Sequence, residues 1–262
     1  MVSRRSLFSA AVVLGLASVP TRASGQTLHI NDQWSQCAIV IDPSLSPAAW
    51  KQFVSELGIV AYLRPLASAE PLGRRHVEIA LLNWSTRIDD ADAAWNDTFS
   101  HPHPDHYLMD GSALHIPGVL VRVGVADRAD VGAYITKAIG ANYGFVGGQV
   151  QYNLLNDAKR QFSASTRLSS VWLYGPEDMT ASTHGLDFVV SKRVSSFSPY
   201  VGVSSYISRA RETTSKVDLD PETAYGSQAM VGMVVHLSLL RLGGEFHFAD
   251  KPGMSMKVAF DL

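Results

Sequence analysis

The sequence predicts an all-β protein, an antiparallel transmembrane β-barrel of about ten strands, alternatively twelve, with a short N-terminal helix. Three observations predict this fold. Residues 254–262 end the chain in strict alternation, which places Phe260 and Lys257 on opposite faces of one strand. Segments with the same two-residue period follow one another from about residue 76 onward. Short connections between them alternate with longer polar ones, as in barrels that have short periplasmic turns and long external loops.

Residues 1–25 have the layout of a secretory signal peptide. Arg4 and Arg5 precede a mostly apolar run over 9–20, and residues 23–25 are small enough for cleavage. The apolar run is too short to remain as a membrane-spanning helix. Because paired arginines also resemble a twin-arginine signal, Sec and twin-arginine export both remain open. We therefore expect an exported protein.

Composition narrows the function classes. The 262 residues carry a net charge of −2 with 18% charged residues, which gives no indication of a nucleic-acid partner or a polybasic membrane patch. After residue 25 no run approaches the roughly 18 apolar residues of a transmembrane helix. The single cysteine, Cys37, excludes an internal disulfide and is expected to be a buried or half-buried thiol.

Residues 26–73 differ from the rest and are interpreted as a periplasmic or plug segment. Ser46 precedes a proline, as expected for a helix N-cap, and apolar residues then recur at helical spacing, so a helix is predicted over about 47–57. We expect the helix to close the periplasmic mouth. Residues 59–66 are predicted as a short strand outside the wall. In the twelve-stranded alternative, 59–66 and 38–41 join the wall.

Residues 74–262 are predicted to form the barrel, with an apolar outer face and a polar lumen. A soluble sandwich or lipocalin-like barrel also alternates. The membrane barrel is favoured because the apolar face is nearly free of charge and aromatic residues lie near strand ends. Charges of both signs on the polar face are expected to pair within a narrow lumen. The predicted lumen-lining residues are Glu78, Arg122, Gln149, Gln151, Arg167, Asp187, Arg193, His236, Glu245, His247 and Lys257.

Three stretches also carry a family resemblance. They are Arg87-Ile88-Asp89-Asp90 through Trp95-Asn96-Asp97-Thr98-Phe99, Gly140-Ala141-Asn142-Tyr143-Gly144-Phe145 through Gln149-Val150-Gln151-Tyr152-Asn153, and Leu173-Tyr174-Gly175-Pro176-Glu177-Asp178. Over most of the mature chain the sequence resembles an uncharacterised family of bacterial outer-membrane β-barrel proteins. The resemblance implies a fold and a location in the cell outer membrane. That family has no assigned reaction, so no functional residues carry over.

One motif points to different chemistry. His101-Pro-His103-Pro-Asp105-His106 matches the H-x-H-x-D-H pattern with which metallo-β-lactamase-type hydrolases hold zinc. The flanking sequence lacks the apolar strand and glycine-rich helix start of that fold, so the pattern is interpreted as part of a polar loop. No metal site and no cofactor are predicted.

We therefore expect a passive role, as a narrow channel or binding barrel for small or apolar solutes, or as a structural wall component. The expected partners are outer-membrane lipid and lipopolysaccharide, and the barrel-assembly machinery through the C-terminal strand. The alternative class is an enzyme. It would be a hydrolase at the barrel rim using Asp187 with His184, or a soluble exported zinc hydrolase using the histidine-rich stretch.

Overall fold

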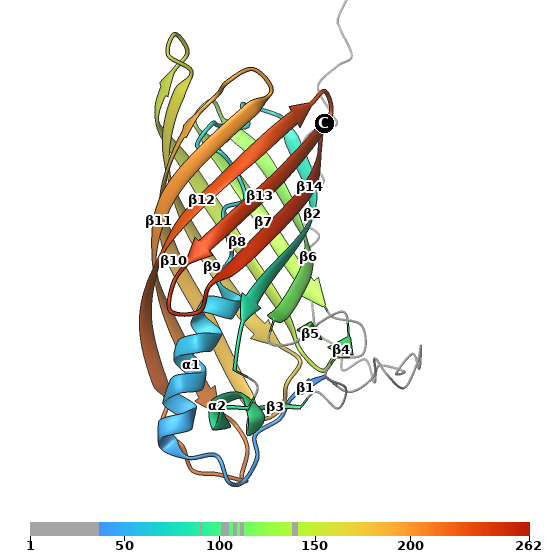
Figure 1. The fold of residues 1–262 in the computed structure, drawn as a ribbon, viewed down its shortest axis with the longest axis vertical. Coiled ribbons are helices and arrows are strands. Elements are labelled where there is room, and N and C mark those ends of the chain that lie inside the picture. Colours follow the sequence, from blue (N-terminus) through green and yellow to red (C-terminus); the bar gives the residue numbers. More distant parts are fainter. Residues whose placement is uncertain (1–36, 90, 101–104, 107–108, 111–112, 138–140) are drawn as a thin grey trace, which may run out of the picture.

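The computed structural model describes residues 37–262 except 90, 101–104, 107–108, 111–112 and 138–140. Within these residues, ten antiparallel strands close into a barrel, because β2 pairs with β14 along one edge and with β6 along the other (Figure 1). Closure leaves no unpaired edge in the wall, as the interior of a membrane requires. The wall strands are β2 (Val77–Arg87), β6 (Ala113–Ala126), β7 (Ala129–Lys137), β8 (Gly144–Asp157), β9 (Phe162–Tyr174), β10 (Met179–Lys192), β11 (Phe197–Glu212), β12 (Glu222–Leu237), β13 (Leu240–Phe248) and β14 (Gly253–Asp261).

The prediction of a ten-stranded antiparallel barrel with a short N-terminal helix is confirmed, and the twelve-stranded alternative is wrong. Residues 59–61 end helix α1 (Pro47–Ala61), and residues 62–66 form no strand. Strand β1 (Ala38–Ile39) pairs with β3 (Phe99–Ser100) in a separate two-stranded sheet. Neither segment can join the wall, because every wall strand already pairs on both sides.

Side chains alternate between the two faces of the wall. In β14, Met256 and Phe260 point outward and are 60% and 52% exposed, whereas Lys257 points inward and is 3% exposed. The same alternation places Val121 outside and Arg122 inside on β6. The outer surface is therefore predominantly apolar at mid-strand, and the inner surface carries most of the buried polar groups.

The two ends of the barrel differ. At the tight-turn end, short turns span residues 127–128, 158–161, 193–196 and 238–239. The C-terminus lies there too, since the Leu262 N–H donates to the Val77 carbonyl at 2.8 Å. At the long-loop end, the connections span residues 88–112, 138–143, 175–178, 213–221 and 249–252. The first of these contains α2 (Ala93–Asn96), β3, β4 (Asp105–His106) and β5 (Met109–Asp110).

Helix α1 begins where the sequence predicts and continues four residues beyond the predicted end. The Ser46 hydroxyl caps it by accepting from the Ala49 N–H at 3.2 Å. The helix packs against β10, β11 and β12, and its apolar residues Trp50, Phe53 and Leu57 are buried. Among the described residues, no helix is long and apolar enough to span a membrane.

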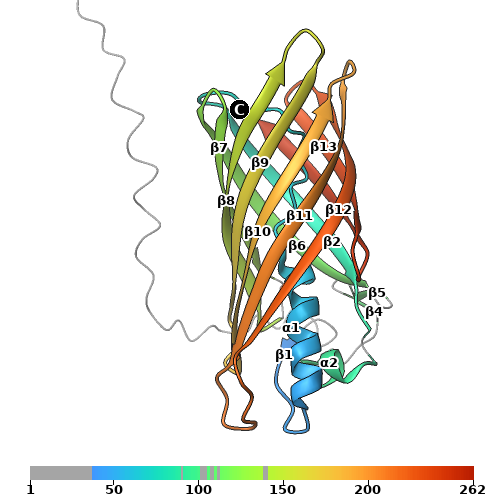
Figure 2. The same cartoon turned by 90° about the vertical axis from the view of Figure 1, so that its left-hand side faces the viewer.

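Helix α1 does not lie at the tight-turn end, where the periplasmic mouth is expected from the sequence. Both views show α1 at the long-loop end, opposite the C-terminus (Figures 1 and 2). The reason is the path that follows: residues 62–72 run back through the barrel, and the chain emerges at the tight-turn end to begin β2 at Val77.

Candidate functional site

The lumen is occupied by the chain itself. We call residues 62–72 the lumen segment. Its residues Tyr62, Leu63, Arg64 and Leu66 have no exposed surface, although they belong to no strand or helix. Tyr62 lies against the wall at Gly185, where a Cβ atom would overlap its ring. The missing side chain at Gly185 therefore makes room for the lumen segment.

Wall side chains bind the backbone amides of the lumen segment. The Leu66 N–H donates to the Glu245 carboxylate at 3.3 Å, and the Leu72 N–H donates to Asp130 at 3.1 Å. A buried amide without a partner would cost roughly 1–3 kcal/mol. These carboxylates on the wall therefore substitute for the partner strand that an extended backbone normally has.

Other wall side chains bind the carbonyls of the same segment. Arg167 Nη2 donates to the Leu63 carbonyl at 2.5 Å, and Asn153 Nδ2 donates to the Ala69 carbonyl at 2.8 Å. The lumen segment is thus held from the wall through both its amides and its carbonyls. Because these contacts are made by main-chain atoms of the lumen segment, they impose no clear periodicity on its side chains.

A buried ion pair lies where the lumen segment enters from α1. Arg167 Nε donates to Asp187 at 2.6 Å, and its Nη1 donates to Gln149 at 2.8 Å. The second oxygen of Asp187 accepts from Tyr62 and from Ser204, each at 2.5 Å. Since Arg167 and Asp187 are 2% and 0% exposed, the charges neutralise each other away from water.

A second charged cluster lies towards the tight-turn end. Glu78 accepts from Lys257 at 3.0 Å and from Arg122 at 3.3 Å, and Arg241 lies 3.6 Å from its other oxygen. Arg122 also donates to Asp130 at 3.0 Å, the carboxylate that binds the lumen segment. The cluster therefore connects the charged wall directly to the segment inside it.

Nine of the eleven predicted lumen-lining residues are buried, and Arg193 and His236 are half-buried. Arg193 follows β10 at the tight-turn end and lies 3.5 Å from Glu70. His236 lies in the same region, 3.1 Å from the Ser198 hydroxyl. The structure does not bring the set to one point, because its members are distributed around and along the wall.

Sequence reasoning missed Tyr62 and Arg64, which lie inside the lumen. Arg64 donates to Gln228 at 3.1 Å, to Thr86 at 2.8 Å and to the Ile59 carbonyl at 3.1 Å. The available signal was one arginine inside an otherwise apolar run. An arginine at such a position needs buried polar partners, which an isolated short strand would not supply.

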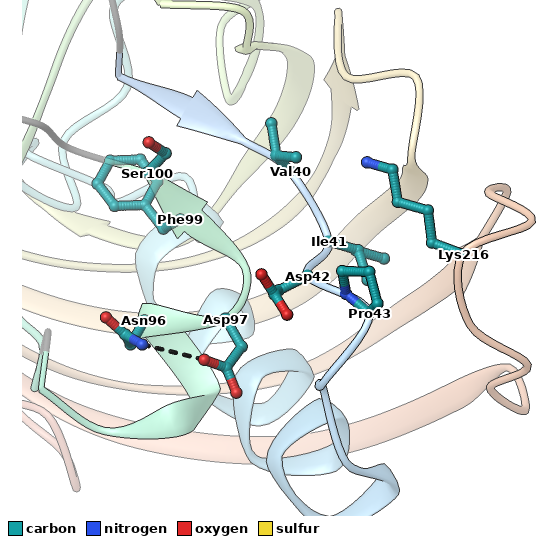
Figure 3. A pocket seen from close by; sticks show the side chains of 9 residues that line it. All are labelled: Val40, Ile41, Asp42, Pro43, Asn96, Asp97, Phe99, Ser100 and Lys216. Carbon is teal, nitrogen blue, oxygen red and sulfur yellow. Dashed lines mark hydrogen bonds between the residues drawn. The ribbon is translucent and has the colours of Figure 1, made fainter.

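A hollow of about 630 Å³ opens at the long-loop end; we call it the mouth pocket (Figure 3). Asp42 and Asp97 come from two different segments that meet there, since the Asp42 N–H donates to the Asp97 carbonyl at 2.8 Å. Lys216 lines the opposite side and forms an ion pair with Asp178 at 2.7 Å. The remaining lining residues are Val40, Ile41, Pro43, Asn96, Phe99 and Ser100.

Hydrogen bonds favour the charged form of Asp42 and of Asp178. The Ser44 hydroxyl and N–H both donate to Asp42 and lower the pKa of its carboxyl. Burial acts to raise the pKa of Asp178, but hydrogen bonds from Lys216 and the Ile41 N–H outweigh it, and the pKa is lowered. The mouth pocket therefore presents ionised groups of both signs.

The proposed rim pair of Asp187 and His184 is wrong. The two residues are three positions apart on β10, so they point to opposite faces of the wall. His184 lies outside, 2.8 Å from the Ser170 hydroxyl, while Asp187 is buried in the lumen. In the histidine-rich stretch, His101 and His103 lie outside the described residues. No group of three metal-ligating side chains occurs in the described part of the chain.

No family model and no curated protein matches the chain. Among solved structures, it is similar to the COG4313 outer membrane channel from Pseudomonas putida F1, with 10% identity, a TM-score of 0.45, and coverage of 77% of this chain and 100% of that one. It is similar to the outer membrane protein OprG from Pseudomonas aeruginosa, with 10% identity, a TM-score of 0.32, and coverage of 74% and 99%. It is also similar to the KdgM porin, with 8% identity, a TM-score of 0.33, and coverage of 69% and 98%.

The wall itself defines the class. A closed antiparallel barrel with an apolar outer surface and buried charges inside is an outer-membrane β-barrel protein, because such a surface is stable against lipid and costly against water. Within that class, the particular feature of this chain is a barrel whose lumen holds its own N-terminal segment.

Proposed function

We propose that this protein is a narrow outer-membrane channel held closed by its own N-terminal segment, the lumen segment together with α1. The buried lumen segment carries the proposal, since Leu66, Leu72, Leu63 and Ala69 all bind the wall through their backbone atoms. A barrel of ten strands has little interior space beyond that filled by side chains, so one extended segment is enough to close it.

The opening step would be withdrawal of the N-terminal segment. The lumen segment leaves behind wall charges that already pair with one another, such as Arg167 with Asp187 and Arg122 with Glu78. These pairs give the vacated lumen a polar lining suited to small hydrophilic or weakly charged solutes. Withdrawal would not leave most of the wall charges without a partner.

The mouth pocket supports a binding role for the same barrel. Residues Val40 to Pro43 line it, and they belong to the segment that leads into α1. A small solute bound between Asp42, Asp97 and Lys216 would contact the part of the chain that must move for opening. A binding barrel and a gated channel are thus compatible uses of one structure.

Planar-bilayer recordings test the closed state. We expect little or no steady conductance from the intact mature protein. Deletion of residues 27–72 should produce steady openings, because it removes both α1 and the lumen segment. Deletion of 27–57 should have a smaller effect, since the lumen segment remains.

A matched control removes only residues 27–36, which precede the described part of the chain, and should behave as the intact protein does. Heat-modifiable migration on a gel shows whether each variant has folded as a barrel. Large stable steps from the intact protein, or no change after deletion of 27–72 in a folded barrel, would contradict the proposal.

A further inference from the structure

The outer face of β9–β12 changes from apolar to basic toward the long-loop end. Strand register aligns the outward residues in rows that cross these strands. One row nearer the tight-turn end contains Val190, Val201 and Val231, all facing outward. Moving toward the long-loop end, the row of Leu168, Leu186, Ser205 and Ser227 is mixed, with two exposed leucines and two serines.

Two arginines lie on this outer face at its long-loop end. Arg209 lies in a row between Ser182 on β10 and Thr223 on β12, and Arg211 lies opposite Thr180. Both arginines are exposed and lie on the outward face of β11, roughly 7 Å apart along the strand. Their shared face directs two guanidinium groups toward the same region outside the barrel.

These arginines differ from the arginines of the lumen. Arg122 and Arg167 each have a buried carboxylate partner. Among the described residues, neither Arg209 nor Arg211 has a hydrogen-bond or ion-pair partner. Two adjacent guanidinium groups without an anionic partner in the chain are available for an external anion.

A hollow of about 320 Å³ lies at the same place, and we call it the rim groove. Arg209, Arg211 and Trp172 line it, together with hydroxyl groups from Thr180 and Ser182. Its remaining lining residues are Ala181, Ala210, Pro221, Glu222 and Thr223. Glu222 lies one position from Thr223 and therefore belongs to the inward-facing register.

Aromatic residues mark the same level as a membrane boundary. Trp172 lies in the row of Arg209 and is 48% exposed, and Tyr225 lies one row nearer mid-barrel and is 77% exposed. Exposed tryptophan and tyrosine are enriched where lipid headgroups meet water. The rim groove is thus expected at headgroup level, with the apolar rows against acyl chains.

We propose that the rim groove binds the phosphate of an anionic lipid headgroup in the outer leaflet, the chemistry found in lipopolysaccharide. Arg209 and Arg211 bind the phosphate oxygens, the hydroxyls of Thr180 and Ser182 donate to them, and Trp172 packs on the sugar or acyl region. The inference rests on the outer-membrane location with the long loops outside. It does not depend on the proposal that the N-terminal segment closes the channel.

Binding of purified lipid A to the full-length folded protein in detergent tests the proposal, with native mass spectrometry as the readout. The variant Arg209→Gln with Arg211→Gln should bind lipid A roughly tenfold or more weakly, because it removes both charged hydrogen-bond donors to the phosphate. The control variant Lys159→Gln with Arg160→Gln removes the same charge at the tight-turn end and should bind as the wild type does. Lipid A from which the phosphates have been removed should bind poorly to the wild type.

Three results would overturn the proposal. Equal weakening in both double variants would show a bulk charge effect only. Equal binding of phosphorylated and dephosphorylated lipid A would remove phosphate as the recognised group. Full displacement of lipid A by millimolar inorganic phosphate would identify a site for free phosphate. Heat-modifiable migration and unchanged bilayer recordings of the arginine variant would show that the barrel and its closed state are intact.

Discussion

Replacement of Arg167 by glutamine tests whether the buried ion pair holds the lumen together. The change leaves Asp187, which has no exposed surface, with only the neutral donors Tyr62 and Ser204. Removal of one partner of a buried ion pair costs about 3–5 kcal/mol. Because two neutral donors remain, we expect a loss near the lower limit, about 3 kcal/mol in the free energy of unfolding.

Urea unfolding of the folded barrel in detergent, followed by tryptophan fluorescence, measures this loss. The double variant Arg167→Gln with Asp187→Asn should be less destabilised than the sum of its single variants, by about 0.5–3 kcal/mol. The control Arg160→Gln should change stability by less than about 0.5 kcal/mol, since the Arg160 side chain is 87% exposed. A loss below about 1 kcal/mol for Arg167→Gln, or additive effects in the double variant, would refute the reasoning.

Two further predictions concern the wall and the mouth. Phe260→Asp places a charge on the lipid-facing surface of β14. Such a charge destabilises the folded barrel by about 2–4 kcal/mol at mid-membrane and by less near the interface, so the heat-modifiable fraction should fall. Normal assembly would contradict the outward orientation assigned to Phe260. The lowered pKa of Asp178 means that its ionised form stabilises the fold above the ordinary value of 3.8, and that this contribution is lost as pH falls through the lower folded value. Urea midpoints of wild type and Asp178→Asn should therefore differ at pH 7 and approach each other as the pH falls below the ordinary Asp value and through the lowered pKa of Asp178. A difference that stays constant with pH would contradict the assignment.

The inward or outward orientation of wall residues was predictable because successive side chains of a strand point to opposite faces, which gives the sequence a two-residue period. Phe260, Lys257 and Arg122 could each be assigned a face from their immediate neighbours, and the structure places them as predicted. The estimate of about ten strands followed from the order of short and long connections, with twelve as the alternative. The twelve-stranded alternative depended on residues 59–66, a mostly apolar run whose composition also fits a strand.

The contents of the lumen were not predictable in the same way. Residues 62–69 of the lumen segment are buried, so they lack the alternation that a surface imposes. Its binding depends on backbone atoms of residues such as Leu66 and Leu72, which leave no pattern in side-chain type. The partners Glu245 and Asp130 lie far from it in sequence.

By itself, the sequence determined the barrel, its facings and the polar lining, because each depends on residues close together along the chain. Only the tertiary structure decided that α1 lies at the long-loop end, that residues 62–72 fill the lumen, and that Arg209 and Arg211 meet Trp172 outside it. Those features depend on strand register and on contacts between distant segments. The periodicity of a sequence contains no information about such contacts, because the residues that make them are brought together only in the closed barrel.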